Sequence, residues 1–163
     1  MRIAIGSDGM GFALKEIVKE HLCSSGYLVT DFGTKDPSVP VIYIEAADDV
    51  CCAVSNGSAD FGIVICRTGM GVSMIANKHC GIRAALCESV YTARESRRIN
   101  NCNVLALGKD VVGEQLACEI VQMFLNTPFA DGETDARREL LSSYLSDFAA
   151  FEKKAFLHNS RHS

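Results

Sequence analysis

Residues Ala59–Lys78 read ADFGIVICRTGMGVSMIANK, and this stretch determines the predicted fold class. The continuous apolar run Phe61–Ile65 is typical of a strand that is covered on both faces of a sheet. Cys66–Gly71 then forms a turn with two glycines, and a helix is predicted from about Val72 to Lys78. A buried strand that leads through a short turn into a helix indicates an α/β protein with a parallel sheet.

The alternation of strand and helix extends on both sides of this stretch. Further strands are predicted at Arg2–Gly6, Tyr27–Asp31, Ile82–Leu86 and Val104–Leu107. Further helices are predicted at Phe12–Cys23, Tyr43–Val54, Val90–Arg98 and Val111–Leu125, the first with a polar face of Lys15, Glu16, Lys19 and Glu20. This order predicts parallel strands with helices on both faces, and ligands of such sheets bind at the carboxyl ends of the strands.

The chain divides into two parts. We assign residues 1–130 to one domain and residues 131–163 to a C-terminal helical extension, because the polar loop Phe129–Asp135 separates them. The extension carries a predicted helix over about Asp135–Leu157, with apolar residues gathered on one side. We expect this helix at a subunit interface, with packing against its own domain as the alternative.

The composition excludes several classes of protein. The chain has 163 residues, of which 48% are apolar and 22% charged, and its net charge is -4. These values fit one globular domain, whereas a general nucleic-acid-binding protein needs a basic face. No apolar run approaches the roughly 18 residues of a membrane span, so neither nucleic acid nor a membrane is an expected partner.

Eight cysteines are many for this length, and they occur at positions 23, 51, 52, 66, 80, 87, 102 and 118. No pair has the CxxC spacing of a zinc or redox motif, and no metal site is expected. We interpret the cysteines as reduced and mostly buried in a cytoplasmic protein.

The turn Cys66–Ser73 is the richest source of chemistry in the chain. Glycines at the start of a helix let backbone N–H groups converge on an oxyanion, either a phosphate or an enediolate, although a plain tight turn is the alternative. Cys66 stands where this turn begins, and a thiol near a helix N-terminus can have a lowered pKa. Such a thiolate can act as a base toward a carbon acid or as a nucleophile.

Polar residues near other strand ends are further candidates. Asp8 follows the first predicted strand and can accept hydrogen bonds from substrate hydroxyls or cap the first helix. Thr68 and Ser73 can donate to an anion. A phosphate could be bound by a cation, and the candidates, each of which can equally be a solvated surface charge, are Arg94, Arg97, Arg98, Lys109, Arg137 and Arg138.

The chain resembles the type B ribose-5-phosphate isomerases and the two subunits of galactose-6-phosphate isomerase. The resemblance rests on Arg2–Leu22, Ala59–Lys78, Gly81–Leu86, Asn100–Gly108 and Val111–Val121, and its most specific part is the pattern CxTGxGxSxxANK from Cys66 to Lys78. It implies a Rossmann-like three-layer α/β fold with a five-stranded parallel sheet and an extra C-terminal helix. It also implies a homodimer that can pair into a tetramer, and isomerisation without a metal or cofactor.

The resemblance also implies roles for individual residues. Cys66 matches the base that moves a proton between C1 and C2 through a cis-enediolate, and Thr68 matches the hydroxyl that assists proton movement between the oxygens. The anion hole that stabilises the enediolate is matched by the amides of Gly69, Met70, Gly71, Val72 and Ser73. The residues that match substrate-binding positions are Asp8, Tyr43, Asn100 from the partner subunit, and the phosphate-binding Arg137.

The chain departs from this family pattern at several positions. Gly9 and Ile99 replace histidines, of which the second opens the sugar ring in most ribose-type members. Asp110 and Glu133 replace phosphate-contacting arginines, and Arg67 replaces the glycine after the catalytic cysteine. Three explanations are open: other cations rebuild the phosphate site, the substrate is smaller, linear or unphosphorylated, or the chain is one half of a heteromer.

We predict an aldose–ketose isomerase of a sugar phosphate, with ribose 5-phosphate to ribulose 5-phosphate in the pentose phosphate pathway as the default reaction. The alternative substrates are galactose 6-phosphate and a four-carbon sugar phosphate, with a second subunit type as a further option. A four-carbon sugar phosphate cannot form the usual phosphorylated ring, so it would tolerate Ile99. The remaining alternatives are a non-catalytic sugar-binding relative and a thiol-redox protein.

Overall fold

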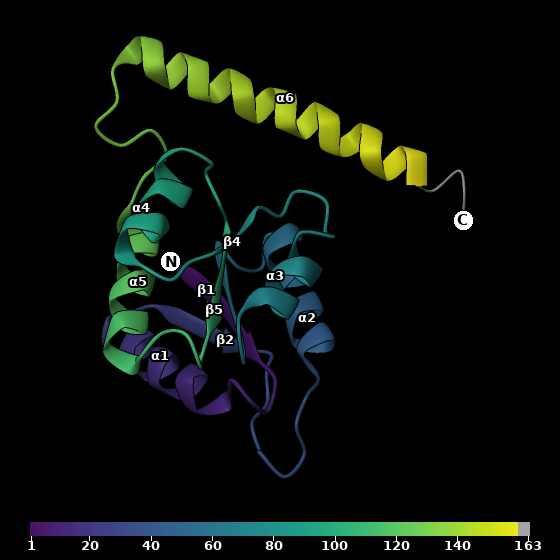
Figure 1. Cartoon of the computed structure of the whole chain (residues 1–163), viewed down its shortest axis with the longest axis vertical. Coiled ribbons are helices and arrows are strands. Elements are labelled where there is room, and N and C mark those ends of the chain that lie inside the picture. The colour runs from purple at the N-terminus through teal and green to yellow at the C-terminus, as the bar shows by residue number, and fades with distance from the viewer. Residues whose placement is uncertain (160–163) are drawn as a thin grey trace.

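The computed structural model describes residues 1–159, the last three by their backbone only. Within this range the chain alternates strands and helices (Figure 1). The strands are β1 (Arg2–Ser7), β2 (Leu28–Asp31), β3 (Phe61–Cys66), β4 (Ala84–Leu86) and β5 (Val104–Gly108). The helices are α1 (Phe12–Ser24), α2 (Tyr43–Ser55), α3 (Met70–Ala76), α4 (Val90–Arg98), α5 (Glu114–Asn126) and α6 (Asp135–Asn159).

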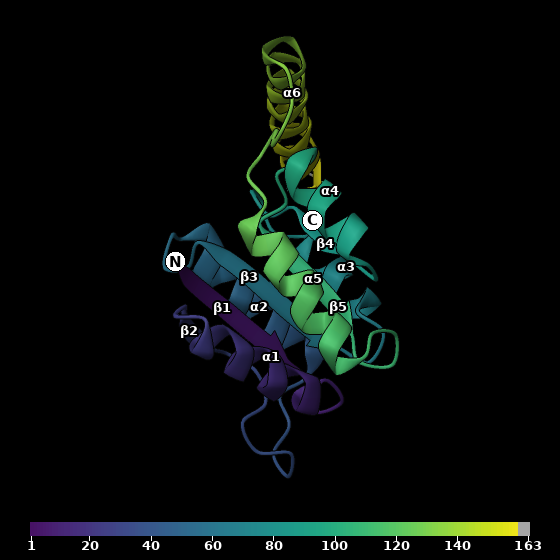
Figure 2. The same ribbon diagram turned by 90° about the vertical axis from the view of Figure 1, so that its left-hand side faces the viewer.

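The strands form one parallel sheet in the order β2-β1-β3-β5-β4. Helices α1, α4 and α5 cover one face and α2 and α3 the other, so the fold has three layers (Figures 1 and 2). The predicted α/β sheet is confirmed. The strand order reverses between β1 and β3, which is where ligands of such sheets bind.

The core consists of two apolar clusters on opposite faces of the sheet, because successive strand residues point to opposite faces. Ile63 and Ile65 of β3 pack with α1, α4 and α5, whereas Val64 and Cys66 pack with α2 and α3. These four residues are all at least 94% buried, as the uninterrupted apolar run predicts for a central strand. Cys66 therefore ends the strand on the α3 side of the sheet.

Two expectations about buried residues are wrong. Helical spacing predicts Lys15 on the polar face of α1, but its side chain is fully buried and pairs with Asp31 of β2. The cysteines are free thiols, but half rather than most of them are buried, namely Cys51, Cys66, Cys87 and Cys102. Side-chain spacing predicts which face of a helix is apolar, but it does not report a partner that is distant in sequence.

Helix α6 stands apart from the three layers. It crosses over one end of the domain as a single long rod, seen from the side in Figure 1 and nearly end-on in Figure 2. Leu141 is buried, whereas Leu140, Tyr144, Phe148 and Phe151 of the same helix are exposed. None of the helices in the described range is long and apolar enough to cross a membrane.

Candidate active site

Cys66 lies at the carboxyl end of β3 with 6% of its surface exposed. The Gly69 amide donates a hydrogen bond to its Sγ atom over 3.2 Å, so the turn folds back onto the thiol. Gly69 has a φ of +77°, and a Cβ at this position would lie 2.4 Å from Cδ1 of Leu86. Only glycine suits this backbone conformation and this space, which explains why a glycine follows the cysteine at this distance.

Helix α3 begins at Met70, two residues earlier than the sequence predicts. The Met70 amide donates to Oγ1 of the exposed Thr68 over 3.4 Å, and the Ser73 amide donates to the Gly69 carbonyl. Within the described residues the amides of Gly71 and Val72 have no partner. Of the five predicted anion-hole amides, these two are therefore free to bind an oxyanion.

The turns after β3 and β5 lie side by side because Cys66 pairs with Gly108 in the sheet register. The Lys109 amide donates to the Cys66 carbonyl and the Asp110 amide donates to the Arg67 carbonyl, both over 3.0 Å. A Cβ at Gly108 would lie 2.6 Å from the Thr68 carbonyl oxygen, so the glycine allows the two turns to approach this closely. These two hydrogen bonds continue the β3–β5 pairing beyond the ends of the strands and place Asp110 beside Arg67.

The side chains of the two turns form an ion-pair cluster. Nε of Arg67 donates to Oδ2 of Asp110 over 2.7 Å, and Nζ of Lys109 lies 2.8 Å from the other Asp110 oxygen. The hydrogen bonds from Lys109 and Arg67 lower the pKa of the Asp110 carboxyl below its ordinary value. Asp110 thus binds the guanidinium group of Arg67, the residue that follows Cys66 in the chain.

Asp8 and Tyr43 line a hollow of about 430 Å³ at the same edge of the sheet. Oδ1 of Asp8 accepts the Gly11 amide over 2.8 Å, so one carboxylate oxygen fixes the entry to α1. The ring of Tyr43 packs on Gly71, where a Cβ would lie 3.0 Å from Cε2. The structure therefore brings Asp8, Tyr43, Cys66 and the glycine turn to one edge, as the sequence predicts.

The loop that carries Pro40 into this hollow is anchored by Lys15. Nζ of Lys15 donates to Asp31 and, over 2.7 Å, to the carbonyl of Thr34. Oγ1 of Thr34 in turn accepts the Val41 amide over 3.0 Å. Sequence reasoning missed this chain of contacts, because Asp31, Thr34 and Val41 lie beyond the end of α1 and no spacing within the helix reports them.

Asn100 lies at the opposite edge of the sheet, as does the start of α6, which carries Arg137 and follows a segment tied to the end of α4 (Figure 1). Asn100 precedes β5 while Cys66 is level with the last residue of β5, and the five residues of that strand span about 16 Å. Asn100 lines a groove of about 480 Å³ together with Ile99 and Tyr144 of α6. Neither Asn100 nor Arg137 can reach Cys66 of its own chain.

Glu133, the second acid that replaces an arginine, is also at this far edge. It forms an ion pair with Arg98, whose guanidinium also binds both carboxylate oxygens of Glu95. The Ala130 amide donates to the Arg98 carbonyl, which ties the segment before α6 to the end of α4. Glu133 thus has a structural partner within its own chain.

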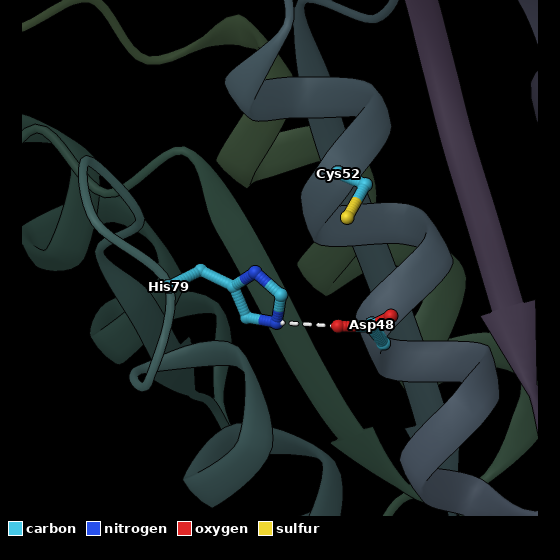
Figure 3. Close-up of side chains that lie close together, drawn as sticks. All are labelled: Asp48, Cys52 and His79. Carbon is cyan, nitrogen blue, oxygen red and sulfur yellow. Dashed lines mark ion pairs between the residues drawn. The ribbon is translucent and has the colours of Figure 1, made fainter. Parts of the chain in front are cut away.

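Three residues could hold a metal ion elsewhere in the fold. Asp48 and Cys52 of α2 and His79, which follows α3, have donor atoms within 4.8 Å of one another (Figure 3). Nε2 of His79 lies 3.1 Å from Oδ1 of Asp48. Burial and then the nearby carboxylates Asp48 and Asp49 raise the pKa of Cys52. Cys52 lies about 14 Å along α2 from Tyr43, so these donors are not part of the site at Cys66.

Comparisons with known proteins identify the family. The model of the Ribose/Galactose Isomerase family matches residues 3–141. The solved structure of Clostridium thermocellum ribose-5-phosphate isomerase B superposes with a TM-score of 0.86 at 42% identity, covering 95% of this chain and 99% of the other. The chain belongs to the ribose/galactose isomerase family. Its membership confirms the predicted family, the Rossmann-like fold and the class of enzyme, an aldose–ketose isomerase.

Two curated members of the ribose/galactose isomerase family differ in their named substrates. The 4-deoxy-4-sulfo-D-erythrose isomerase of Clostridium sp. is 40% identical, covering 96% of this chain and 98% of that protein. The D-erythrulose-4-phosphate isomerase of Pectobacterium atrosepticum is 36% identical, covering 88% and 95%. Both names specify a four-carbon sugar with an anionic group at carbon 4.

Proposed function

We propose that this isomerase interconverts the aldose and ketose forms of a four-carbon sugar that carries an anionic group at carbon 4. The observation that carries the proposal is the thiol of Cys66 at the carboxyl edge of the sheet, hydrogen-bonded to the turn that also exposes Thr68. Such a thiol can take a proton from the carbon next to a carbonyl and return it to the neighbouring carbon.

The reaction needs a proton to move and a negative charge to be stabilised. Cys66 removes the proton from C2 of the aldose, and the electron pair moves to the carbonyl oxygen to give a cis-enediolate. The free amides of Gly71 and Val72 stabilise the negative oxygen. Thr68 moves a proton between the two oxygens, and Cys66 returns its proton to C1, which yields the ketose with the protein unchanged.

One departure from the family pattern, Ile99, favours four carbons over ribose 5-phosphate, whereas a second, Gly9, is compensated within the chain. Ile99 cannot transfer the proton that opens a sugar ring, and a four-carbon sugar substituted at carbon 4 has no ring to open. Gly9 is in contact with Pro40, so the loop occupies the space that a longer side chain at position 9 would fill. The two curated relatives named for four-carbon sugars support this proposal.

We also infer that the active protein is a homodimer. Asn100 and Arg137 lie at the far edge from Cys66, so their predicted roles require the site of a second subunit. The apolar side chains that α6 exposes, Leu140, Tyr144, Phe148 and Phe151, are suited to an interface that continues onto another copy. The alternatives are a tetramer and a dimer with a second type of subunit. In either assembly the exposed face of α6 would form part of an interface.

A reducing compartment fits the free thiols. The eight cysteines form no disulfide in the structure, including the exposed Cys23, Cys52 and Cys80. Exposed thiols stay reduced in the cytoplasm, so we retain the cytoplasm as the proposed location. A role in the pentose phosphate pathway follows only if ribose 5-phosphate is the substrate, so it is not part of this proposal.

Proton exchange in D2O tests the proposed reaction. Purified protein is mixed with four-, five- and six-carbon sugars, each with and without a terminal anion, and NMR follows deuterium uptake at C2 of the aldose or C1 of the ketose. We expect the fastest exchange with erythrose 4-phosphate or its 4-sulfo analogue. Cys66→Ala should lower the rate by about 100-fold or more, and circular dichroism should show that the variant keeps its fold.

A matched cysteine variant separates catalysis from general thiol effects. Cys80 is exposed and lies after α3, outside the site, so Cys80→Ala should keep full activity. Undiminished exchange in Cys66→Ala would exclude the thiol as the base. Faster exchange with ribose 5-phosphate than with every four-carbon sugar would overturn the proposed substrate class but not the isomerase.

A further inference from the structure

Arg67 presents an unused half of its guanidinium group beside the proposed base. Its side chain is 67% exposed although Nε is bonded to Asp110. The two Nη atoms have no partner within the residues that the structure describes. A guanidinium that is oriented by one contact and open at two donors can bind an oxyanion through a pair of parallel hydrogen bonds.

The position of Arg67 is fixed by backbone as well as side-chain contacts. Its carbonyl accepts the Asp110 amide over 3.0 Å, and the preceding carbonyl, of Cys66, accepts the Lys109 amide. Asp110 receives a cation on each carboxylate oxygen, Arg67 on one and Lys109 on the other. Two cations and one anion leave this cluster with one net positive charge at the edge of the sheet where the reaction takes place.

We propose that Arg67, oriented by Asp110, binds the terminal anion of the substrate. The proposal rests on the proposed function, since it names the residue that recognises the group at carbon 4. Consecutive Cα atoms are about 3.8 Å apart, so an arginine directly after the base can reach the far end of a short substrate whose C2 lies at the thiol. Arg67 then takes the place of the phosphate-contacting arginine that the family pattern has at position 110, and Asp110 orients it.

Asp110 also affects which anion is preferred. A phosphate ester carries about -1.5 to -2 charges at neutral pH, whereas a sulfonate carries one. Removing the negative charge of Asp110 raises the net charge of the cluster, and this change stabilises a bound phosphate more than a bound sulfonate. The two terminal groups named in the curated relatives can therefore be distinguished by a single substitution at position 110.

The test compares substrates that differ only at carbon 4. Steady-state rates are measured for the 4-phosphate and 4-sulfo four-carbon sugars, and D2O exchange is measured for unsubstituted erythrulose. Arg67→Gln should raise KM for both anionic sugars by 10-fold or more and leave exchange in erythrulose within 2-fold. Asp110→Asn should shift the ratio of kcat/KM for phosphate over sulfonate upward by at least 3-fold.

Control measurements make each outcome decisive. Arg2 is another exposed arginine with a single acidic partner, Asp60, and it lies at the opposite end of the strands, so Arg2→Gln should match wild type. An unchanged KM in Arg67→Gln, or an equal loss with erythrulose, would overturn the anion-binding role while leaving the isomerase intact. If no four-carbon sugar is turned over, the proposed function fails. Calorimetric binding of inorganic phosphate and sulfate then tests Arg67 separately. Weaker binding of these anions by Arg67→Gln than by wild type supports the anion-binding role, and equal binding rejects it.

Discussion

Gly9 and Pro40 are in direct contact across the mouth of the site. A Cβ at Gly9 would lie 2.8 Å from the Cβ of Pro40, closer than real carbon atoms approach without movement. The glycine at position 9 and the loop that carries Pro40 are therefore one structural feature. The family's histidine cannot be restored here without displacing that loop.

The first prediction follows from this contact. Gly9→His should lower the free energy of unfolding by about 1–3 kcal/mol, because an overpacked side chain forces its neighbours to move. Combining it with Pro40→Gly should cost less than the sum of the two single substitutions, and urea unfolding of the four proteins measures the difference.

Gly113 provides the matched position for this experiment. A Cβ there meets no atom within 4 Å, so Gly113→His tests the same exchange in open space. We expect that variant to stay within about 0.5 kcal/mol of wild type. Strict additivity of the substitutions at positions 9 and 40 would show that the loop does not rest on Gly9.

The second prediction concerns the buried pair of Lys15 and Asp31. Burial opposes ionisation of Asp31, but hydrogen bonds from Lys15, the Gly33 amide and Lys19 outweigh it and lower the pKa of this carboxyl below 3.8. A carboxyl whose pKa is lower in the folded chain contributes stability above its ordinary pKa and loses it as the pH falls through the folded value. The free energy of unfolding should therefore decrease as the pH is lowered from about 4.

Asp31→Asn tests this assignment by urea unfolding at neutral and acidic pH. At pH 7 the variant should lose about 1.5–3 kcal/mol, because the buried Lys15 loses its charged hydrogen bond to Asp31 and keeps only the partly exposed Glu16 as an anionic partner. The loss relative to wild type should shrink as the pH falls below 4. Asp49→Asn, a substitution of an exposed carboxylate on α2, should show neither effect, and an equal loss at both pH values would contradict the role of Asp31 ionisation.

The sheet could be predicted from the sequence because β3 and β5 are apolar at every position. The position of Cys66 and of its turn could be predicted in the same way, since the turn follows directly from the strand and its glycines are local signals. The pairing of Arg67 with Asp110 could not, because it depends on the register that sets Cys66 opposite Gly108. Each of the two residues departs from the family pattern, but only the parallel pairing of β3 and β5 makes them neighbours.

Lys15 is a second case in which a distant contact changed the interpretation. Helical spacing places it with Glu16 and Lys19, but Asp31 and the Thr34 carbonyl come from a segment beyond the end of α1 and take the amine into the protein. A buried cation is stable only with such partners, and no local pattern reports them. The loop that reaches Pro40 therefore depends on a residue that spacing alone assigns to the surface.

The third prediction uses the cysteines as probes of burial. Burial is the main cause that raises the pKa of Cys51 to about 12 and that of Cys102 to about 11. Because the thiolate is the reactive form, neither residue should react with iodoacetamide at pH 7.5 in the native protein. Mass spectrometry should find the label on the exposed Cys23 first, and early labelling of Cys102 would mean that the groove beside α6 opens in solution.

The fourth prediction tests whether each site is shared between two subunits. Cys66 and Asn100 lie at opposite edges of one sheet, so a site that uses both takes them from different chains. Cys66→Ala and Asn100→Ala should each be nearly inactive, yet a mixed dimer contains one site in which both residues are intact. Random mixing after unfolding and refolding should restore about a quarter of wild-type activity, since half the dimers are mixed and half of their sites are complete.

Mixing Cys66→Ala with the double variant Cys66→Ala/Asn100→Ala is the control and should restore nothing. No recovery in the first mixture, with dimers demonstrated by light scattering, would mean that Asn100 does not serve the partner's site.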